Sequence, residues 1–338
     1  MGSANCCGSD NFDKKEKRQK KNKNLHISIE IKKVKEINDS YELNNNNFQY
    51  NNKIDVLTKG LKNDNNSCYI NSFIQILFHC PLFLKKLTNE KSLVNYSDLI
   101  KYLIQFSEYY DEKYLEEIRK IMEKYYNDFQ ENKQCDSQDF GEKLIDRIIK
   151  EIKFQKDSYS KTSESSNINY LDKYFLEEIE MEKLFTLIEC KNKYDSNYKN
   201  NSINFTYELQ LNLSKNKNSK YDLEKLLNCK YNNLKIRKFP EILIITINRA
   251  KLNEKYNLKD IIYPYTLNME KYSFENKKIK YKLFALNKKS GDSADEGHYF
   301  CNIKINETWY IFNDTIVEPK NPENTQGNIV GLFYFKDN

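Results

Sequence analysis

The stretch Gly60-Leu-Lys-Asn-Asp-Asn-Asn-Ser-Cys-Tyr-Ile-Asn-Ser-Phe-Ile-Gln75 places Cys68 between a polar run and an apolar one. From residue 68 to residue 80 the apolar residues recur at helical spacing, and Ser67 is a residue type that caps helix N-termini. The sequence therefore predicts a helix that begins at Cys68. Free N–H groups and the macrodipole at such a position favour the reactive thiolate form of a cysteine, so Cys68 is a candidate nucleophile. The alternative is an inert thiol in an apolar core.

A thiolate nucleophile needs a general base, normally an imidazole held by a third polar group. The chain has three histidines. His79 follows Cys68 on the same predicted helix, about 16 Å further along its axis, which is beyond hydrogen-bond reach. His26 lies beside a charged N-terminal tail for which no fixed structure is expected. His298 therefore remains as the candidate base.

His298 lies at the start of a predicted β-hairpin. Residues 299–305 and 309–312 have the composition of paired strands, with a turn at Asn306-Glu307. Such a hairpin brings Asn313 alongside His298, where its side chain would bond one ring nitrogen and leave the other facing the thiol. An asparagine near a turn can also cap its own backbone, and a strand histidine can be satisfied by any polar neighbour.

These two segments resemble the Cys box and the His box of the ubiquitin-specific proteases, papain-like cysteine peptidases that remove ubiquitin. Other segments resemble the family's short glutamine and aspartate motif, its core strand and three later segments, in the expected order. They are Gln134–Phe140, Phe239–Arg249, Tyr263-Pro264 with Leu267-Asn268, Tyr281–Leu286 and Gly331–Phe335. The resemblance covers roughly residues 58–336, the size of one large domain. Several motifs in order are far more specific than one.

The resemblance implies an α+β, papain-like fold, in which a helical half precedes a β-rich half and the active site lies in the cleft between them. It also implies a cysteine-type deubiquitinase, that is, a thiol-dependent ubiquitinyl hydrolase without a cofactor. Cys68 would attack the C-terminal glycine carbonyl of ubiquitin in an isopeptide or peptide bond, and water would hydrolyse the resulting thioester.

The family's motifs also imply roles for individual residues. His298 would be the base and then the acid for the leaving amine, oriented by Asn313, with Asp314 as the alternative third member. Asn63 matches the family's oxyanion donor, whose loss costs roughly a hundred- to a thousandfold in rate.

A further group of residues is expected to bind substrate. These residues are Gln134, Asp136, Gly297 and Tyr299. Gly297 would leave room for a slender Gly-Gly tail beside the base. The alternative for the Gln134–Phe140 motif is purely structural: Asp136 or Ser137 would cap a helix with a buried apolar face. That face would carry Leu144, Ile145, Ile148, Ile149 and Ile152.

The chain departs from the family pattern at the expected zinc site. Many members hold zinc in a fingers subdomain through two Cys-x-x-Cys pairs. The corresponding stretches here, Cys190–Lys193 and Cys229–Asn232, offer one thiol each. The sequence therefore predicts no metal and a reduced, zinc-free fingers region held by packing. The remaining thiols outside the N-terminus are expected to be inert: Cys80, Cys135, Cys229 and Cys301.

Three other departures lie near the site. Asp64 and Asn65 replace a small apolar residue and a glycine ahead of Cys68, which predicts a strained or restricted loop. An acidic Asp64 would also oppose thiolate formation. Lys289 stands where the family often has a second histidine.

Composition limits the class of protein. The 338 residues are 31% charged and 39% hydrophobic, and no apolar run approaches the roughly 18 residues that span a membrane. The net charge is +6, but residues 14–23 (KKEKRQKKNK) alone carry that excess. A nucleic-acid-binding domain is therefore not expected, because its basic residues would persist on a folded face. Eight cysteines without a disulfide pattern fit a reducing compartment and a cytoplasmic protein.

Two regions follow from the patterning. Residues 1–55 read as a polar, low-complexity basic tail, and residues 56–338 as the catalytic domain. Helical patterns dominate residues 67–155, a polar stretch at 156–169 predicts an exposed loop, and strand patterns dominate from residue 203 onward.

The first residues carry a separate pattern. Gly2 satisfies the requirement for N-myristoylation, although Cys6 stands where serine or threonine is preferred. Cys6 and Cys7 would then accept palmitate, and the basic run supplies the second attachment that a single acyl chain needs. Such an anchor would place the protein at the cytoplasmic face of a membrane. The alternative is an accidental Gly2 before a disordered tail, interrupted by a strand-like pattern at 25–31.

Three functions remain open from the sequence. The first is an active deubiquitinase, with ubiquitin or ubiquitinated proteins as partners. The second is a weak or inactive pseudo-peptidase that binds ubiquitin, and the third is a peptidase for another ubiquitin-like modifier. Retention of Cys68 and His298 favours the first, since binding alone requires neither.

Overall fold

The computed structural model describes residues 58–130, 133–159, 178–191, 203–213, 220–249, 256–294 and 296–337. All of them belong to one compact unit, Ile54–Asn338. Gly2, Cys6, Cys7, the basic run and the strand-like pattern at 25–31 lie outside the described residues, so the acylated tail stays a prediction. Within the described ranges, no helix is long and apolar enough to cross a bilayer.

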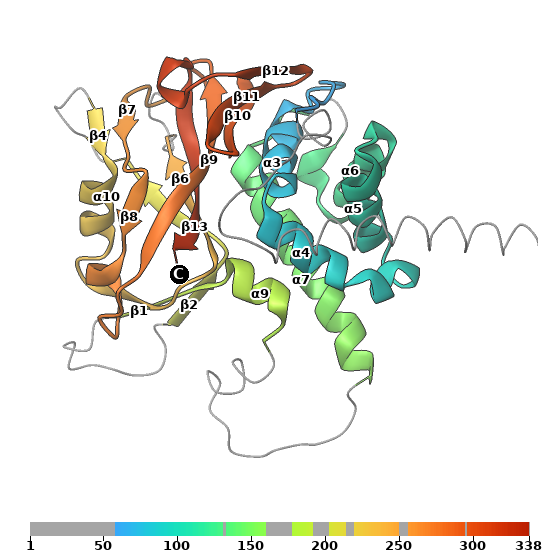
Figure 1. Cartoon of the computed structure of the whole chain (residues 1–338), viewed down its shortest axis with the longest axis horizontal. Helices are drawn as coiled ribbons and strands as arrows, with labels where there is room; N and C mark the ends of the chain where they lie inside the picture. Colours follow the sequence, from blue (N-terminus) through green and yellow to red (C-terminus); the bar gives the residue numbers. More distant parts are fainter. Residues whose placement is uncertain are drawn as a thin grey trace, which may run out of the picture. The chain divides into compact units, whose positions relative to one another are not determined.

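The first half of the described chain is helical, as predicted (Figure 1). Its elements are α3 (Cys68–Phe78), α4 (Pro81–Asn89), η1 (Lys91–Asn95), α5 (Asp98–Tyr109), α6 (Glu112–Tyr125), η2 (Asn127–Phe129), α7 (Ser137–Tyr159) and α9 (Glu180–Phe185). The loop expected from residue 156 was placed too early, because α7 runs on to Tyr159. A helix propagates by one backbone hydrogen bond per added residue, so it can outlast its apolar face.

The second half is built on a mixed sheet with the order β12-β11-β10-β9-β13-β6-β3, and β8 also pairs with β9. All pairs are antiparallel except β3 with β6. The strands are β3 (Leu209–Asn212), β6 (Ile242–Asn248), β8 (Thr266–Asn268), β9 (Lys280–Ser290), β10 (His298–Ile305), β11 (Thr308–Asn313), β12 (Ile316–Pro319) and β13 (Asn328–Asp337).

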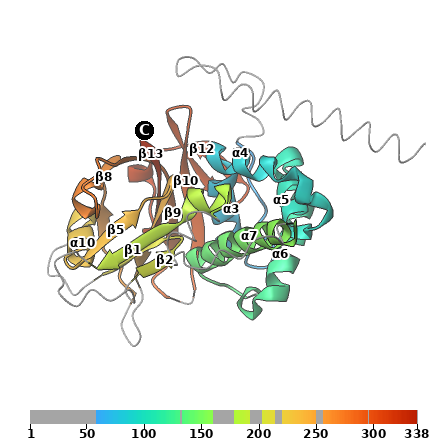
Figure 2. The same ribbon diagram turned by 90° about the horizontal axis from the view of Figure 1, so that it is seen from below.

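Smaller elements complete the β-rich half. Figure 2 shows β1 between β2 and β5, which form a separate three-stranded sheet. The bounds are β1 (Leu187–Lys191), β2 (Ile203–Thr206), β5 (Leu234–Lys238), the parallel pair β4 (Lys220–Asp222) and β7 (Asp260–Ile262), α10 (Leu223–Lys230), η3 (Glu270–Tyr272) and η4 (Pro322–Asn324). The order of a helical half followed by a β-rich half is confirmed.

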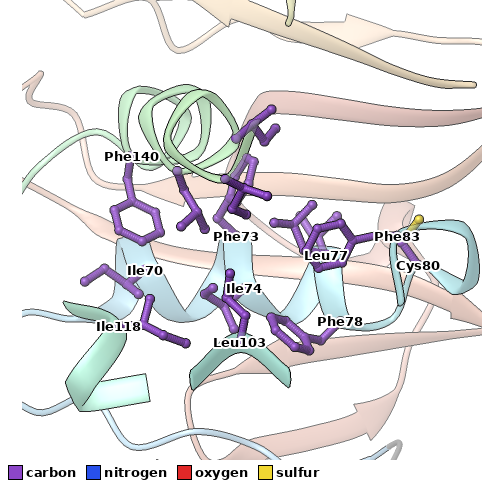
Figure 3. Packing of buried hydrophobic residues seen from close by; sticks show 14 of the residues in the cluster. Ile70, Phe73, Ile74, Leu77, Phe78, Cys80, Phe83, Leu103, Ile118 and Phe140 are labelled. Carbon is purple, nitrogen blue, oxygen red and sulfur yellow. The ribbon is translucent and has the colours of Figure 1, made fainter. Parts of the chain in front are cut away.

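Helix α3 is the centre of the core, because all of its residues are buried. Figure 3 shows its side chains between Phe140 of α7 and Leu103 and Ile118 of α5 and α6. At Gly141 of α7, an added Cβ would lie 2.0 Å from the Phe73 ring, so glycine permits the close approach of α7 to α3. Packing on every side gives α3, and therefore Cys68 at its start, a fixed position relative to the sheet.

Candidate active site

Cys68 is the first residue of α3, as the sequence predicted, and its side chain is buried. The expected cap is wrong in detail. Ser67 occupies the N-cap position but makes no capping hydrogen bond, and its hydroxyl instead donates to the Lys62 carbonyl at 3.4 Å. The N–H groups of the first turn of α3 therefore have no partner in the Ser67 side chain, which leaves them oriented toward an anion at Cys68.

His298 begins β10, and the hairpin brings it to the end of β11. Its turn residues Asn306 and Glu307 both have positive φ, as a two-residue type I′ turn requires. His298 Nε2 lies 2.5 Å from Asn313 Oδ1 and 3.5 Å from Asp314 Oδ2. Both candidates for the third member therefore lie near the same ring nitrogen.

The Cys68 thiol also acts on the imidazole of His298. It is the largest influence on the pKa of His298, and the Asn313 bond and the Asp314 charge act in the same direction. Together they raise its pKa to about 9, although burial opposes the shift. The protonated ring is the form that pairs with a thiolate, so the arrangement favours an imidazolium facing a nucleophilic sulfur.

Asn71, which sequence reasoning missed, connects the two halves of the site. Its Nδ2 donates to the Lys62 carbonyl at 2.8 Å and to Asp314 Oδ1 at 3.3 Å. The N–H of Leu61 donates to the Asp314 carbonyl at 2.9 Å. The loop before Cys68 is thus fastened to the turn that follows Asn313. A polar residue one helical turn after the nucleophile, in an otherwise apolar helix, was the signal available in the sequence.

The four residues expected to bind substrate connect the start of α7 to the start of β10. Gln134 Nε2 donates to the Gly297 carbonyl, and the Tyr299 hydroxyl donates to Asp136 Oδ2 at 3.2 Å. Asp136 Oδ1 accepts from the Gln138 N–H at 2.8 Å, so Asp136, rather than Ser137, caps α7. These contacts hold the peptide bonds around His298 in place. The alternative interpretation of the Gln134–Phe140 motif, a helix cap, therefore applies to Asp136.

Gly297 has a second reason to be glycine. Its φ is +150°, and an added Cβ would lie 2.4 Å from the Ser290 carbonyl oxygen and 2.6 Å from Lys289 Cε. Lys289 is buried, and its ammonium donates to the carbonyls of Ser293 and Ala294. Lys289, which stands where the family often has a second histidine, thus holds the loop of the β9–β10 hairpin.

The conformation of the loop before Cys68 explains how Asp64 and Asn65 are accommodated there. Asn65 and Asn66 adopt φ of 54° and 62°, the left-handed region that asparagine tolerates better than most residues. Asn63 and Asp64 are both exposed. Water screens an exposed carboxylate, so we expect Asp64 to oppose the thiolate only weakly. Asn63 lies on the surface of the loop five residues before Cys68, with its side chain free to approach a bound substrate.

The other thiols among the described residues take no part in this arrangement. Cys80 and Cys301 are buried, and burial raises the pKa of Cys80 to about 12 and that of Cys301 well above its usual range. Cys190 is buried in β1, and Cys229 is exposed on α10. No group of three or more potential His, Cys, Asp or Glu ligands comes together in the part of the chain that the structure describes.

A polar pocket of about 210 Å³, here called the α7 pocket, lies beside Asp136 between α7, β3 and β6. Three of its buried polar atoms have no hydrogen-bond partner among the described residues: Gln138 Nε2, Arg249 Nη2 and Tyr256 OH. Burial raises the pKa of Glu208, which also lines it, to about 7. Unpaired donors suit a ligand with hydrogen-bond acceptors, such as the carbonyls of an extended peptide.

The model of one protein family, ubiquitin carboxyl-terminal hydrolase, matches residues 59–334. The chain belongs to this family. Ubiquitin carboxyl-terminal hydrolase 4 of Arabidopsis thaliana is 31% identical over 90 residues, which is 25% of each chain. The match thus spans about a quarter of that curated relative.

Solved structures of deubiquitinating modules have the same fold as this chain. The SAGA DUB module of Ubp8, Sgf11, Sus1 and Sgf73 bound to monoubiquitin has a TM-score of 0.66 and 18% identity, covering 83% of this chain and 70% of that chain. The same module bound to ubiquitin aldehyde has a TM-score of 0.62 and 20% identity, with coverages of 83% and 70%. This likeness establishes the papain-like fold that the sequence predicted.

Proposed function

We propose that the chain is a cysteine-type deubiquitinase that hydrolyses isopeptide or peptide bonds at the C-terminal glycine of ubiquitin. One observation carries the proposal: Cys68 stands at the first turn of α3 and is the largest influence on the pKa of His298, whose Nε2 bonds to Asn313. A thiol, an imidazole and an amide in sequence are the machinery of thiol-dependent acyl transfer. Membership of the ubiquitin carboxyl-terminal hydrolase family supplies the substrate class.

The geometry supports a two-step reaction. Cys68 Sγ attacks the glycine carbonyl carbon, and the C–N bond breaks as His298 gives its proton to the leaving nitrogen. The product is a thioester on Cys68 and a free amine. His298, now neutral, takes a proton from water, whose oxygen attacks the thioester and releases the ubiquitin carboxylate and the thiolate. Asn313 keeps His298 Nε2 occupied, so the other ring nitrogen faces the sulfur throughout.

Two pieces of evidence favour ubiquitin over an unrelated peptide. The first is that two neighbours of the same fold have been solved with ubiquitin or its aldehyde bound. The second is the α7 pocket, whose unpaired donors suit the carbonyls of an extended tail and whose lining residue Asp136 bonds to Tyr299, the neighbour of His298. We propose that the tail of ubiquitin lies there, with its glycine end at Cys68.

Asn63→Ala is expected to lower kcat by about a hundred- to a thousandfold, because the tetrahedral oxygen would lose one of its hydrogen-bond donors. The KM should change much less, since the donor acts mainly on the transition state. Steady-state kinetics on a ubiquitin amide reporter would measure both. The exposed neighbour Asp64, changed to Asn, is the matched control and should keep kcat within a few fold. An unchanged kcat in Asn63→Ala would remove Asn63 from the oxyanion site.

Electrophilic probes test the function as a whole. The protein is incubated with probes built on ubiquitin and on ubiquitin-like modifiers, each carrying a thiol-reactive group at its C-terminus. We expect the ubiquitin probe alone to form an adduct, and peptide mapping to place it on Cys68. Labelling by another modifier would identify that modifier as the substrate. If no probe reacts but ubiquitin binds in a titration, the protein is a pseudo-peptidase.

A further inference from the structure

A cleft of about 670 Å³ lies on the helical side of the site, and we call it the α6 cleft. One wall is the loop before Cys68, and the other is α6 from Glu112 to Glu123. Two hydrogen bonds join these walls: the Lys62 N–H donates to Glu112 Oε1 at 2.8 Å, and Arg119 donates to the Asp64 carbonyl at 3.5 Å. The cleft therefore has a defined floor and does not depend on a chance gap between side chains.

The α6 cleft lies next to Cys68, although Cys68 itself does not line it. Ser67, which precedes Cys68, lines it, and so does Asn71, one helical turn later. Asn71 Oδ1 is a buried acceptor without a hydrogen-bond partner among the described residues, although Nδ2 of the same amide is fully used. A buried acceptor left unpaired costs free energy unless a ligand or water satisfies it. This atom is independent evidence that the cleft takes a polar ligand.

The α6 cleft and the α7 pocket lie on different sides of the nucleophile. They share no lining residue. Figure 1 shows α6 on one side of α3 and β6, which lines the α7 pocket, on the other. If the ubiquitin tail lies in the α7 pocket, the part of the substrate beyond the scissile bond would leave Cys68 on the other side, where the α6 cleft lies. The part of the substrate beyond the scissile bond is the leaving amine with its polypeptide.

The charges of the α6 cleft suit a polypeptide with side chains of both signs. Lys62 and Asp64 line it, and neither forms an ion pair with another described residue. On the facing wall, Glu116 and Lys120 are exposed and lie 3.2 Å apart as an i,i+4 pair. Exposed pairs of this kind contribute little to folding, so they can be exchanged for contacts with a ligand.

We propose that the α6 cleft is the leaving-group subsite: it binds the polypeptide segment around the lysine whose ε-amine is joined to ubiquitin. This inference rests on the proposed deubiquitinase function. It assigns recognition of the modified protein to the loop before Cys68 and α6, separate from recognition of ubiquitin at the α7 pocket. Binding there would hold the leaving nitrogen near His298 during C–N cleavage.

Two substrates distinguish an effect on binding in the α6 cleft from an effect on the catalytic reaction. The first is ubiquitin carrying a small fluorescent amine at its C-terminus, which places nothing in the α6 cleft. The second is ubiquitin joined through its C-terminal glycine to the lysine ε-amine of a peptide. The variant is the double charge exchange Glu116→Lys with Lys120→Glu, which interchanges the two charges of the i,i+4 pair and removes the 2.9 Å ion pair of Lys120 with Glu117. Lys124→Glu, on the same helix, exposed and outside the lining, is the matched control.

We expect the exchange to change the kcat/KM for the peptide conjugate by about five- to tenfold, while the small-amine substrate stays within about twofold. The control should leave both substrates unchanged. If kcat/KM fell equally for both substrates, α6 would only support the catalytic loop. If kcat/KM stayed unchanged for both, the cleft would be unused. Either result overturns the inference. Failure of the wild type to cleave the small-amine substrate would instead refute the proposed function.

Discussion

Cys68→Ala is expected to abolish hydrolysis of a ubiquitin C-terminal amide reporter, with a loss of about 10⁴-fold or more. Alanine has no atom that can attack the glycine carbonyl, and His298 cannot act as the nucleophile in its place. The fold should survive, because Cys68 already behaves as a small buried residue at a helix start. Thermal unfolding of the variant and its titration with ubiquitin would verify that the site is intact.

Cys80→Ala is the control for this experiment. Cys80 is equally buried, precedes α4, and has a pKa raised to about 12 by burial, so it stays an unreactive thiol. The Cys80→Ala variant should keep its activity within a few fold. Comparable residual hydrolysis in Cys68→Ala, or a complete loss in Cys80→Ala with an unchanged melting temperature, would contradict Cys68 as the nucleophile.

Activity is expected to fall as the pH rises through about 9. The pKa of His298 is raised to about that value, so the ring stays protonated up to this pH and loses its proton above it. A neutral ring neither pairs with the thiolate nor supplies a proton to the leaving amine. The kcat/KM of the wild type, measured on an amide substrate across neutral and alkaline pH, should show this alkaline limb.

Variants of the third member separate orientation from charge. Asn313→Ala removes the 2.5 Å hydrogen bond to Nε2, and we expect kcat to fall by about 10²- to 10⁴-fold because the ring loses its fixed tautomer. Asp314→Asn keeps the shape but removes a negative charge 3.5 Å from Nε2, so the alkaline limb should move to lower pH with a smaller loss of kcat. The opposite pattern of losses would make Asp314 the third member.

Local patterns were sufficient for the elements of the site. The apolar spacing after Cys68 predicted α3, and the turn at Asn306-Glu307 predicted the hairpin that carries His298 to Asn313. Both features depend on contacts between residues close in sequence, where side-chain periodicity and turn geometry decide the outcome. The missing Ser67 cap was not predictable in the same way, because the Ser67 hydroxyl donates instead to the Lys62 carbonyl. The end of α7 at Tyr159 also lies beyond the point that the apolar pattern indicated.

The sequence by itself predicted the candidate nucleophile and base and indicated the family, because these follow from residue types and their order along the chain. Only the tertiary structure decided how they are held. Asn71 bridges residues 62 and 314, Asp136 receives the Tyr299 hydroxyl, and the α6 cleft forms between a loop and a helix that are about 50 residues apart. Such contacts arise when packing of α3 brings distant segments together, and no local pattern encodes which polar groups will then meet.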